Sequence, residues 1–200
     1  MDSSSWDERY SGEGFVWREE PNQFLVAEVA DLAPGRALDL ACGEGRNAVW
    51  LAGRGWRVTG VDFSSVGLAK AHRLAMERGV DVHWIEADVV EWEPPPATFD
   101  LVIVFYLHLR SDDRHRIMAH AQEALAGEGT LLVVGHDATN LSEGYGGPQD
   151  PTVLFTPEEV ANDLAELRIV RADRVRRDVD TEQGRRVAVD ALVRAVKPKA

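Results

Sequence analysis

Two kinds of apolar segment alternate along most of this chain, and the alternation limits its fold more than any other feature. Short runs rich in Val, Ile and Leu are typical of strands buried on both faces, and longer segments with helical spacing separate them. Asn22 caps the first such helix, which is expected to reach Leu32. Strands are expected at residues 37–41, 57–61, 82–86, 99–106 and 130–135. The pattern predicts an α/β fold with a parallel sheet covered on both faces.

The last third of the chain departs from this alternation. Residues 137–155 are polar, Gly-rich and without periodicity, so we expect a loop there that lies over the site. Thr156-Pro157-Glu158-Glu159 combines an N-cap, a first-turn proline and a capping box, which predicts a helix to about residue 167. Residues 168–178 and 186–196 are extended segments with a short connection, and they predict an antiparallel pair that closes the sheet.

Length and composition favour one folded domain. The chain has 200 residues, of which 44% are hydrophobic and 28% charged, as in ordinary globular proteins. The net charge of −12 disfavours nucleic acid and anionic membrane as partners. Cys42 is the single cysteine and cannot form an internal disulfide. Without a signal-like start or a long apolar run, the expected location is the cytoplasm.

A glycine turn between a strand and a helix is the strongest functional signal. It lies within residues 37–47, where Gly43-Glu44-Gly45 follows the first strand. Glycines let a ligand approach the backbone closely, and the N–H groups at a helix start favour a negative group. A Gly-x-Gly turn also occurs for packing alone, so that alternative stays open. Ala48 stands where many dinucleotide sites have a third glycine, which counts mildly against such a cofactor.

Carboxylates near three strand ends suggest the kind of ligand. Asp39 lies four residues before Gly43, where it would repel a pyrophosphate and attract an ammonium group. A ligand that carries an amino acid therefore fits better than a dinucleotide. Asp62 ends the second strand and can accept hydrogen bonds from ribose hydroxyls. Asp88 follows the third strand and can accept from an adenine amino group while Val89 packs on the ring, although a loop or capping role fits Asp88 equally well.

In order and spacing, residues 37–135 resemble the class I S-adenosylmethionine-dependent methyltransferases, through Asp39-Leu40-Ala41-Cys42-Gly43-Glu44-Gly45, Asp62, Asp88 and the strand at 99–104. The resemblance implies a Rossmann-like three-layer sandwich with a seven-stranded, mostly parallel sheet and a C-terminal antiparallel hairpin. It also implies that S-adenosylmethionine binds at the carboxyl ends of the first four strands and leaves as S-adenosylhomocysteine. The cofactor contacts expected in the domain are Asp39, Ala41, Gly43, Gly45, Asn47, Asp62, Phe63, Ser64, Asp88, Val89 and Phe105.

The first residues are similar to the N-terminal segment of thiopurine-methyltransferase-like and tellurite-resistance methyltransferases, through Trp6-Asp7-Glu8-Arg9-Tyr10. The similarity implies that residues 1–21 form an arm that covers the cofactor and that residues 22–200 form the methyltransferase domain. Aromatic side chains exclude water and can pack on a sulfonium cation. Such a lid would consist of Trp6, Tyr10, Phe15 and Trp17. The alternative is an arm that packs on an apolar groove without touching a ligand.

Methyl transfer to a soft sulfur, selenium or tellurium atom can proceed by positioning alone, whereas a hydroxyl or amine acceptor needs a general base. Base candidates at the ends of the fourth and fifth strands are Tyr106, His108, His136 and Asp137. His108 is the first choice and His136 the second, although either can be a structural residue. His136 and Asp137 could form an oriented pair or could only anchor the loop, and spacing does not decide between them. No Cys/His cluster has metal-ligand spacing, so no metal is expected.

The expected function is methyl transfer to a small molecule, such as a thiol or a chalcogen compound. One alternative is an NAD-type oxidoreductase, and another is a non-catalytic protein that binds S-adenosylmethionine. The arginines at residues 168–186 are interpreted as the solvent-exposed face of an edge strand. A nucleic-acid site is not expected there, because no aromatic residues are interleaved with the arginines. The sequence carries no signal for the acceptor's identity or for the oligomeric state.

Overall fold

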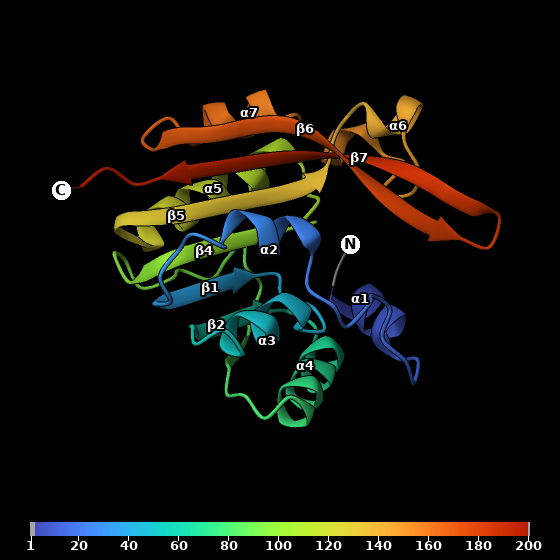
Figure 1. Ribbon diagram of the computed structural model, residues 1–200, viewed down its shortest axis with the longest axis horizontal. Coiled ribbons are helices and arrows are strands. Elements are labelled where there is room, and N and C mark those ends of the chain that lie inside the picture. The colour runs from blue at the N-terminus through green and yellow to red at the C-terminus, as the bar shows by residue number, and fades with distance from the viewer. Residues whose placement is uncertain (1–2, 200) are drawn as a thin grey trace.

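One mixed sheet runs through the computed structural model, which describes residues 3–199 (Figure 1). Within those residues the strand order is β3-β2-β1-β4-β5-β7-β6. The strands are β1 (Arg36–Leu40), β2 (Arg57–Asp62), β3 (His83–Glu86), β4 (Phe99–Phe105), β5 (Leu125–His136), β6 (Arg168–Thr181) and β7 (Gly184–Val196). β1 to β5 are parallel, and β7 pairs antiparallel with both β5 and β6. The predicted α/β class and the terminal hairpin are confirmed.

The strand order reverses between β1 and β4. From β1 the chain moves outward to β2 and β3 and then returns to β4 on the other side of β1. In open α/β sheets, such a switch point leaves a crevice at the carboxyl ends of the strands, and ligands bind there. In this sheet, the ends of β1 and β4 meet at that position.

Helices cover both faces of the sheet and give the molecule three layers (Figure 1). One face packs against α2 (Gln23–Glu28) and α3 (Arg46–Ala52), and α4 (Ser65–Glu77) packs on α3. The other face packs against α5 (Ser111–Ala124) and α7 (Pro157–Asp163). Because successive strand side chains point to opposite faces, the central strands contribute to both apolar cores.

Short elements lie at the carboxyl edge, outside these layers. α1 (Ser3–Tyr10) contacts α4. The segment after β5 contains α6 (Asn140–Glu143) and a 3₁₀ turn at Pro151–Val153, although the sequence predicted only an irregular loop there. Its two ends are joined by a bridge between Asp137 and Phe155. The segment is thus held against the sheet and does not extend away from it.

Two helices are shorter than predicted. The helix that follows Asn22 ends at Glu28 and not at Leu32, and the chain turns at Val29, whose N–H still donates to the Leu25 carbonyl. α7 ends at Asp163 and not near residue 167, and the turn that follows buries two leucines in the core.

Three strands are longer than predicted. β5 begins at Leu125, which pairs with Phe99 before the register shifts and regular pairing resumes at Thr130. In the hairpin, β6 continues to Thr181 and β7 already begins at Gly184, so the pair extends beyond the rest of the sheet (Figure 1).

The capping box of α7 gives a direct stability prediction. Thr156 Oγ1 accepts from the Glu159 N–H at 3.2 Å, and Glu159 Oε2 accepts from the Thr156 N–H at 2.8 Å. We expect Thr156→Ala to lower the free energy of unfolding by about 1 kcal/mol, because the first turn loses an acceptor. Urea denaturation measures this loss. Ser142→Ala, which removes an exposed hydroxyl, is the control and should change the value by less than about 0.5 kcal/mol.

Candidate functional site

The glycine turn that leads from β1 into α3 is tightly packed. Gly43 and Gly45 have φ values of 54° and 80°, in the left-handed region that favours glycine. A Cβ on Gly45 would lie 2.6 Å from the Ala71 Cβ. The Gly43 N–H donates to Asp62 Oδ2 at 2.7 Å, and the Gly45 N–H donates to the Cys42 carbonyl at 2.9 Å. The two glycine amides are therefore engaged within the protein, and packing explains at least part of the motif.

Asp39 presents an unpaired carboxylate oxygen beside this turn. Its side chain lies in β1 and is only 2% exposed, and its Oδ2 atom has no hydrogen-bond partner among the described residues. Burial, followed by repulsion from Asp62, raises the pKa of Asp39 to about 8. Unpaired buried carboxylates are costly. A cationic ligand group would supply the missing partner.

Arg46 places a cation beside the same turn. It is the first residue of α3, and its side chain makes no hydrogen bond or ion pair with other residues in the range 3–199. Burial lowers its pKa, and both Tyr106 and the like-charged Arg177 are close enough to act on it. Asp39 also acts on it electrostatically. An unpaired guanidinium near an unpaired carboxylate oxygen complements the two charges of an α-amino acid.

The predicted ribose acid, Asp62, lies at the end of β2 and close to Asp39. Its Oδ1 accepts from the Ser64 N–H at 2.9 Å, and its Oδ2 accepts from the turn. Burial raises its pKa. Ser64 caps α4 by accepting from the Gly67 N–H at 3.0 Å, and Phe63 between them is half-buried. Each carboxylate oxygen has a second lone pair that can accept from a ribose hydroxyl.

The other predicted cofactor contacts take ordinary structural positions. Asp88 is exposed, and its Oδ1 accepts from the Val90 N–H at 2.9 Å, which is the loop role that the sequence left open. Val89 and Phe105 are buried in the two cores. Ala41 follows β1 with a left-handed φ of 59°.

The N-terminal arm lies across the glycine turn. The Tyr10 ring is 5% exposed, and a Cβ on Gly43 would lie 2.8 Å from its hydroxyl oxygen. Burial raises the pKa of Tyr10 above its ordinary value, followed by the charge of Asp62. Trp6 lies 5.3 Å from Tyr10 between ring centroids, and Trp17 is exposed. Of the four predicted lid residues, Tyr10 thus lies at the turn with Trp6 beside it, whereas Phe15 packs against the apolar cluster between α3 and α4.

Glu44 anchors this arm. Its carboxylate accepts from the N–H groups of Val16 and Trp17 at 3.0 and 3.1 Å. Lys70 on α4 donates to Glu44 Oε1 at 3.1 Å and to the Gly14 carbonyl at 2.5 Å. The middle residue of the Gly-x-Gly motif thus fixes the arm to the domain.

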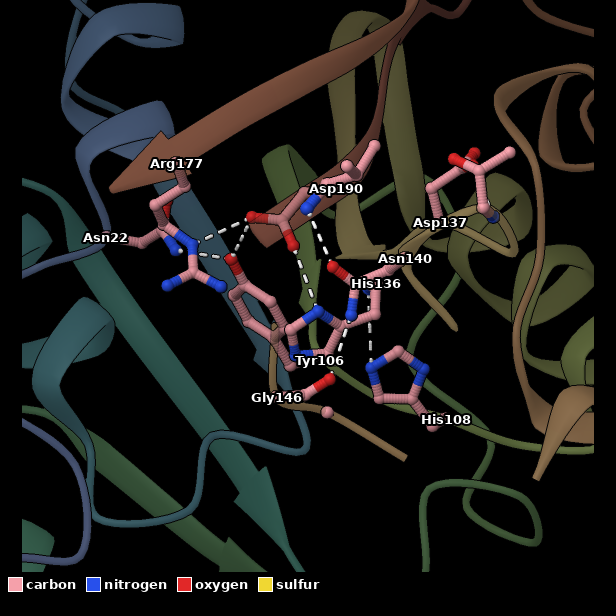
Figure 2. A network of polar contacts seen from close by, with 12 residues as sticks. Asn22, Tyr106, His108, His136, Asp137, Asn140, Gly146, Arg177 and Asp190 are labelled. Atoms are coloured by element: carbon pink, nitrogen blue, oxygen red, sulfur yellow. Dashed lines mark hydrogen bonds and ion pairs between the residues drawn. The ribbon is translucent and has the colours of Figure 1, made fainter. Parts of the chain in front are cut away.

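A polar network occupies the carboxyl ends of β4 and β5 (Figure 2). Asp190 on β7 is fully buried, and its Oδ2 accepts from Tyr106 Oη and from Arg177 Nε, both at 2.8 Å. Asp190 Oδ1 lies 3.2 Å from His136 Nδ1. Asn22 Nδ2 donates to Tyr106 Oη at 3.3 Å. Burial raises the pKa of Asp190, but hydrogen bonds from His136 and Arg177 outweigh that effect and hold it below its usual value.

His108 is held through both ring nitrogens. Its Nε2 accepts from the His136 backbone N–H at 3.4 Å, and its Nδ1 faces the Val153 carbonyl at 3.4 Å. Its ring stacks on His136 with 5.4 Å between centroids. Burial, followed by the charge of His136, lowers the pKa of His108 to about 4. These contacts keep His108 neutral and fix it to the loop after β5.

His136 pairs with Asp190 and not with its neighbour Asp137, so the idea of an adjacent pair is wrong. Asp137 Oδ1 accepts from the Thr139 N–H at 2.8 Å and from Arg174 Nε at 3.1 Å. Successive residues at the end of a strand point to opposite faces, which separates the two side chains. Figure 2 shows Asp137 turned away from the network.

The sequence reasoning missed Asp190, Arg177 and the second role of Asn22. A usable signal existed for Asp190, because it is the single charged residue within the apolar run of residues 187–193. A buried carboxylate in a central strand needs partners. Arg177 was hidden among surface arginines, and Asn22 also serves as the predicted cap by accepting from the Phe24 N–H at 2.9 Å.

Residues 3–199 contain neither a clustered set of metal ligands nor a helix able to span a membrane. No group of three or more His, Cys, Asp or Glu side chains is placed to hold a metal ion there. None of the helices described is both long and apolar enough to cross a membrane.

An open parallel sheet whose order reverses beside β1, with a glycine turn from β1 into α3, is the arrangement of Rossmann-like cofactor-binding domains. Residues 37–129 match a family model described as a methyltransferase domain. The matched segment contains the glycine turn and the strands β1 to β4, on both sides of the point where the strand order reverses.

Two curated relatives similar to this chain are methyltransferases. Demethylmenaquinone methyltransferase of Thermus thermophilus is 36% identical over 104 residues, which cover 51% of this chain and 47% of the relative. Thiocyanate methyltransferase 1 of Arabidopsis thaliana is 27% identical over 167 residues, covering 80% of this chain and 72% of the relative. The match thus spans about half of the Thermus protein's length.

The fold is shared with solved structures. One of these structures was solved for the conversion of a disulfide bond into a thioacetal group during echinomycin biosynthesis. It has a TM-score of 0.80 and 23% identity, and the match covers 98% of this chain and 93% of that one.

Proposed function

We propose that this chain transfers a methyl group from S-adenosylmethionine to a small-molecule acceptor. The observation that carries the proposal is the unpaired Oδ2 of buried Asp39 next to the unpaired side chain of Arg46. These groups fit the ammonium and the carboxylate of a methionine moiety. An ammonium can ionise the buried Asp39 carboxyl group and pair with it, whereas a pyrophosphate in this position would gain no counter-charge from that side chain.

The remaining contacts follow from the same placement. Asp62 would accept from the ribose hydroxyls, and Asp88 with Val89 would flank the adenine. Tyr10 rests on Gly43 and would lie beside the nucleoside, with Trp6 and Trp17 on the outer side. Gly43, Gly45 and Asn47 shape the turn, together with Ala41, Phe63, Ser64 and Phe105 around it.

When bound, S-adenosylmethionine supplies an electrophilic methyl group on a sulfonium sulfur. The chain's part is to bind, align and keep water away. Oriented reactants gain about 7 to 11 kcal/mol over the reaction in water, so positioning carries much of the rate. The anchored N-terminal arm supports this role because it covers the glycine turn with aromatic side chains.

A thiol or another chalcogen compound is the acceptor class that we propose, within the thiopurine-methyltransferase-like and tellurite-resistance group. Its support is the arm on the glycine turn and the similarity to a thiocyanate methyltransferase over most of this chain. The net charge of −12 also favours a small molecule over nucleic acid.

Calorimetric titration tests the cofactor assignment. We expect S-adenosylhomocysteine to bind and NAD(H) to show no binding at the same concentrations. The reverse preference would make the chain an oxidoreductase. Transfer of a labelled methyl group to a panel of thiols, chalcogen oxyanions and phenols then separates an enzyme from a protein that only binds the cofactor.

A further inference from the structure

We propose that His136 is the general base of this methyl transfer, that Asp190 positions it, and that the acceptor is a thiol that binds in its protonated form. The inference rests on the proposed function and specifies its acceptor. It differs from the sequence prediction, in which His108 was the first choice and positioning alone was sufficient for a sulfur acceptor.

The Asp190 carboxylate fixes the orientation of the His136 ring. Asp190 Oδ1 lies 3.2 Å from His136 Nδ1, at ion-pair distance but without hydrogen-bond geometry, and both atoms are buried. A carboxylate in this position favours the Nδ1–H tautomer, which leaves a lone pair on Nε2. The His136 side chain keeps 12% of its surface exposed. This is the arrangement that a general base requires, with one nitrogen held and the other able to accept a proton.

The same carboxylate connects His136 to the cofactor side of the sheet. Its Oδ2 accepts from Tyr106, whose hydroxyl accepts from Asn22 Nδ2 at 3.3 Å. The Asn22 backbone N–H in turn donates to Asn47 Oδ1 at 2.9 Å. Asn47 is the second residue of α3, directly after the glycine turn. A series of polar contacts therefore runs from the turn to the base, with hydrogen bonds as far as Asp190 and an ion-pair contact from Asp190 to His136.

The loop after β5 packs closely on the His136 ring. Gly147 has a φ of 78°, and a Cβ there would lie 2.5 Å from His136 Cδ2 and 2.8 Å from Nε2. Asn140 holds this loop, because its Nδ2 donates to the Gly146 carbonyl at 2.8 Å and its Oδ1 accepts from the Val189 N–H at 2.8 Å (Figure 2). Any larger residue at position 147 would press on the nitrogen that we assign as the proton acceptor.

The charges around the network favour a sulfur anion over a neutral sulfur. Arg177 lies over the Tyr106 ring, with 5.4 Å from its guanidinium carbon to the ring centroid, and Arg46 acts electrostatically on both residues. Alkyl thiols have a pKa of about 8.5 and are mostly protonated at neutral pH. The positive charge of Arg177 at this network favours the thiolate over the thiol, and the imidazole of His136 can accept the proton.

The proposed step balances without a further reactant. The thiol proton passes to His136 Nε2, and the sulfur electron pair forms the new bond to the transferred methyl carbon. The pair of the broken carbon–sulfur bond stays on the donor sulfur, which becomes the neutral thioether of S-adenosylhomocysteine. His136 then returns the proton to water.

His136→Asn tests whether His136 acts as a base, because the loss of activity should depend on whether the acceptor thiol still carries its proton. With an alkyl thiol we expect kcat/KM to fall by about 100-fold or more. With an aromatic thiol that is already ionised at the assay pH, we expect a fall of less than about fivefold, because no proton has to be removed. Added imidazole should restore part of the alkyl-thiol rate. S-adenosylhomocysteine affinity, measured by calorimetry, should stay within about twofold, and His83→Asn on exposed β3 is the matched control.

Asp190→Asn tests the positioning role. We expect at least a tenfold loss with the alkyl thiol, because an amide donor favours the wrong tautomer of His136. The acid limb of the wild-type pH profile should move to lower pH in this variant, since the imidazolium loses its carboxylate partner. The other groups that face His136 are Arg177 through the shared carboxylate, Tyr106 and the His108 ring.

Each outcome is decisive. An equal loss with both thiols would show that His136 is only structural, and an unchanged alkyl-thiol rate would show that no base is needed. If the wild type methylates only acceptors that are already anions and carry no ionisable proton, the assignment of a protonated thiol is wrong. Should the variants fail to fold, nitrogen NMR of the wild-type ring must still show protonated Nδ1 and unprotonated Nε2. Failure of the proposed function looks different, because the wild type would bind no S-adenosylhomocysteine or methylate nothing.

Discussion

Asp39→Asn is expected to weaken S-adenosylhomocysteine binding by about 100-fold. The variant loses a charge-assisted hydrogen bond from the ligand ammonium to a buried carboxylate, and such a bond contributes about 1.5 to 3 kcal/mol, where 1.4 kcal/mol is tenfold. Calorimetry measures the change. The wild type should also release close to one proton on binding near pH 6.5, because the ammonium ionises a carboxyl group whose pKa is about 8. Asp39→Asn should release none from this position.

The same substitution should make the ligand-free protein less sensitive to pH. Burial raises the pKa of Asp39 to about 8, whereas in the unfolded chain it is about 3.9. Between these values the folded protein holds a proton that the unfolded chain lacks, so stability falls as pH rises, by at most about 1.4 kcal/mol per unit. From pH 5 to pH 7, the wild type should therefore lose about 2 kcal/mol relative to Asp39→Asn.

Urea denaturation of the ligand-free proteins at several pH values provides the comparison. Asp81→Asn, at an exposed carboxylate, should follow the wild type in both binding and stability. If Asp39→Asn binds S-adenosylhomocysteine as tightly as the wild type does, Asp39 does not contact the ammonium and the cofactor assignment loses its main support. Parallel stability curves for the two proteins would contradict the buried, unpaired state of the carboxylate.

The sequence predicted the cofactor side of the site because those residues are neighbours along the chain. Asp39 and Gly43 belong to one strand and its turn, and Asp62 follows at the end of the next strand. Strand alternation and turn chemistry determine such local arrangements. The parallel strands and the closing hairpin were predicted from the same local signals, whereas the pairing of β1 with β4 was not.

The acceptor side could not be predicted in this way. His136 and Asp190 are far apart in the sequence and meet only because β7 inserts antiparallel beside β5, with the two residues in register. Arg177 joins them from the edge strand β6 across the pairing of β6 with β7. Registers of this kind depend on the packed sheet and not on local spacing. The one sequence signal was a lone charge within an apolar strand.

Lys70→Met is expected to destabilise the protein by about 3 kcal/mol and to free the N-terminal arm. Lys70 and Glu44 form an ion pair in which the side chains are 8% and 3% exposed, so removing one charge leaves the other buried with fewer partners. The carbonyl of Gly14 also loses its donor. Urea denaturation measures the stability, and limited proteolysis within residues 11–21 measures release of the arm.

Two control variants distinguish the cost of leaving a buried charge unpaired from the cost of losing side-chain packing. Arg116→Met breaks an exposed ion pair with Glu91 and should cost less than about 1 kcal/mol. Glu44→Gln added to Lys70→Met should recover part of the stability, because the uncompensated carboxylate is gone. It should not restore the arm fully, since an amide offers only one oxygen to the N–H groups of Val16 and Trp17. If the double variant is no more stable than Lys70→Met, the loss of stability comes from packing and not from the buried charge. If the arm resists proteolysis in both the single and the double variant, Glu44 does not anchor it.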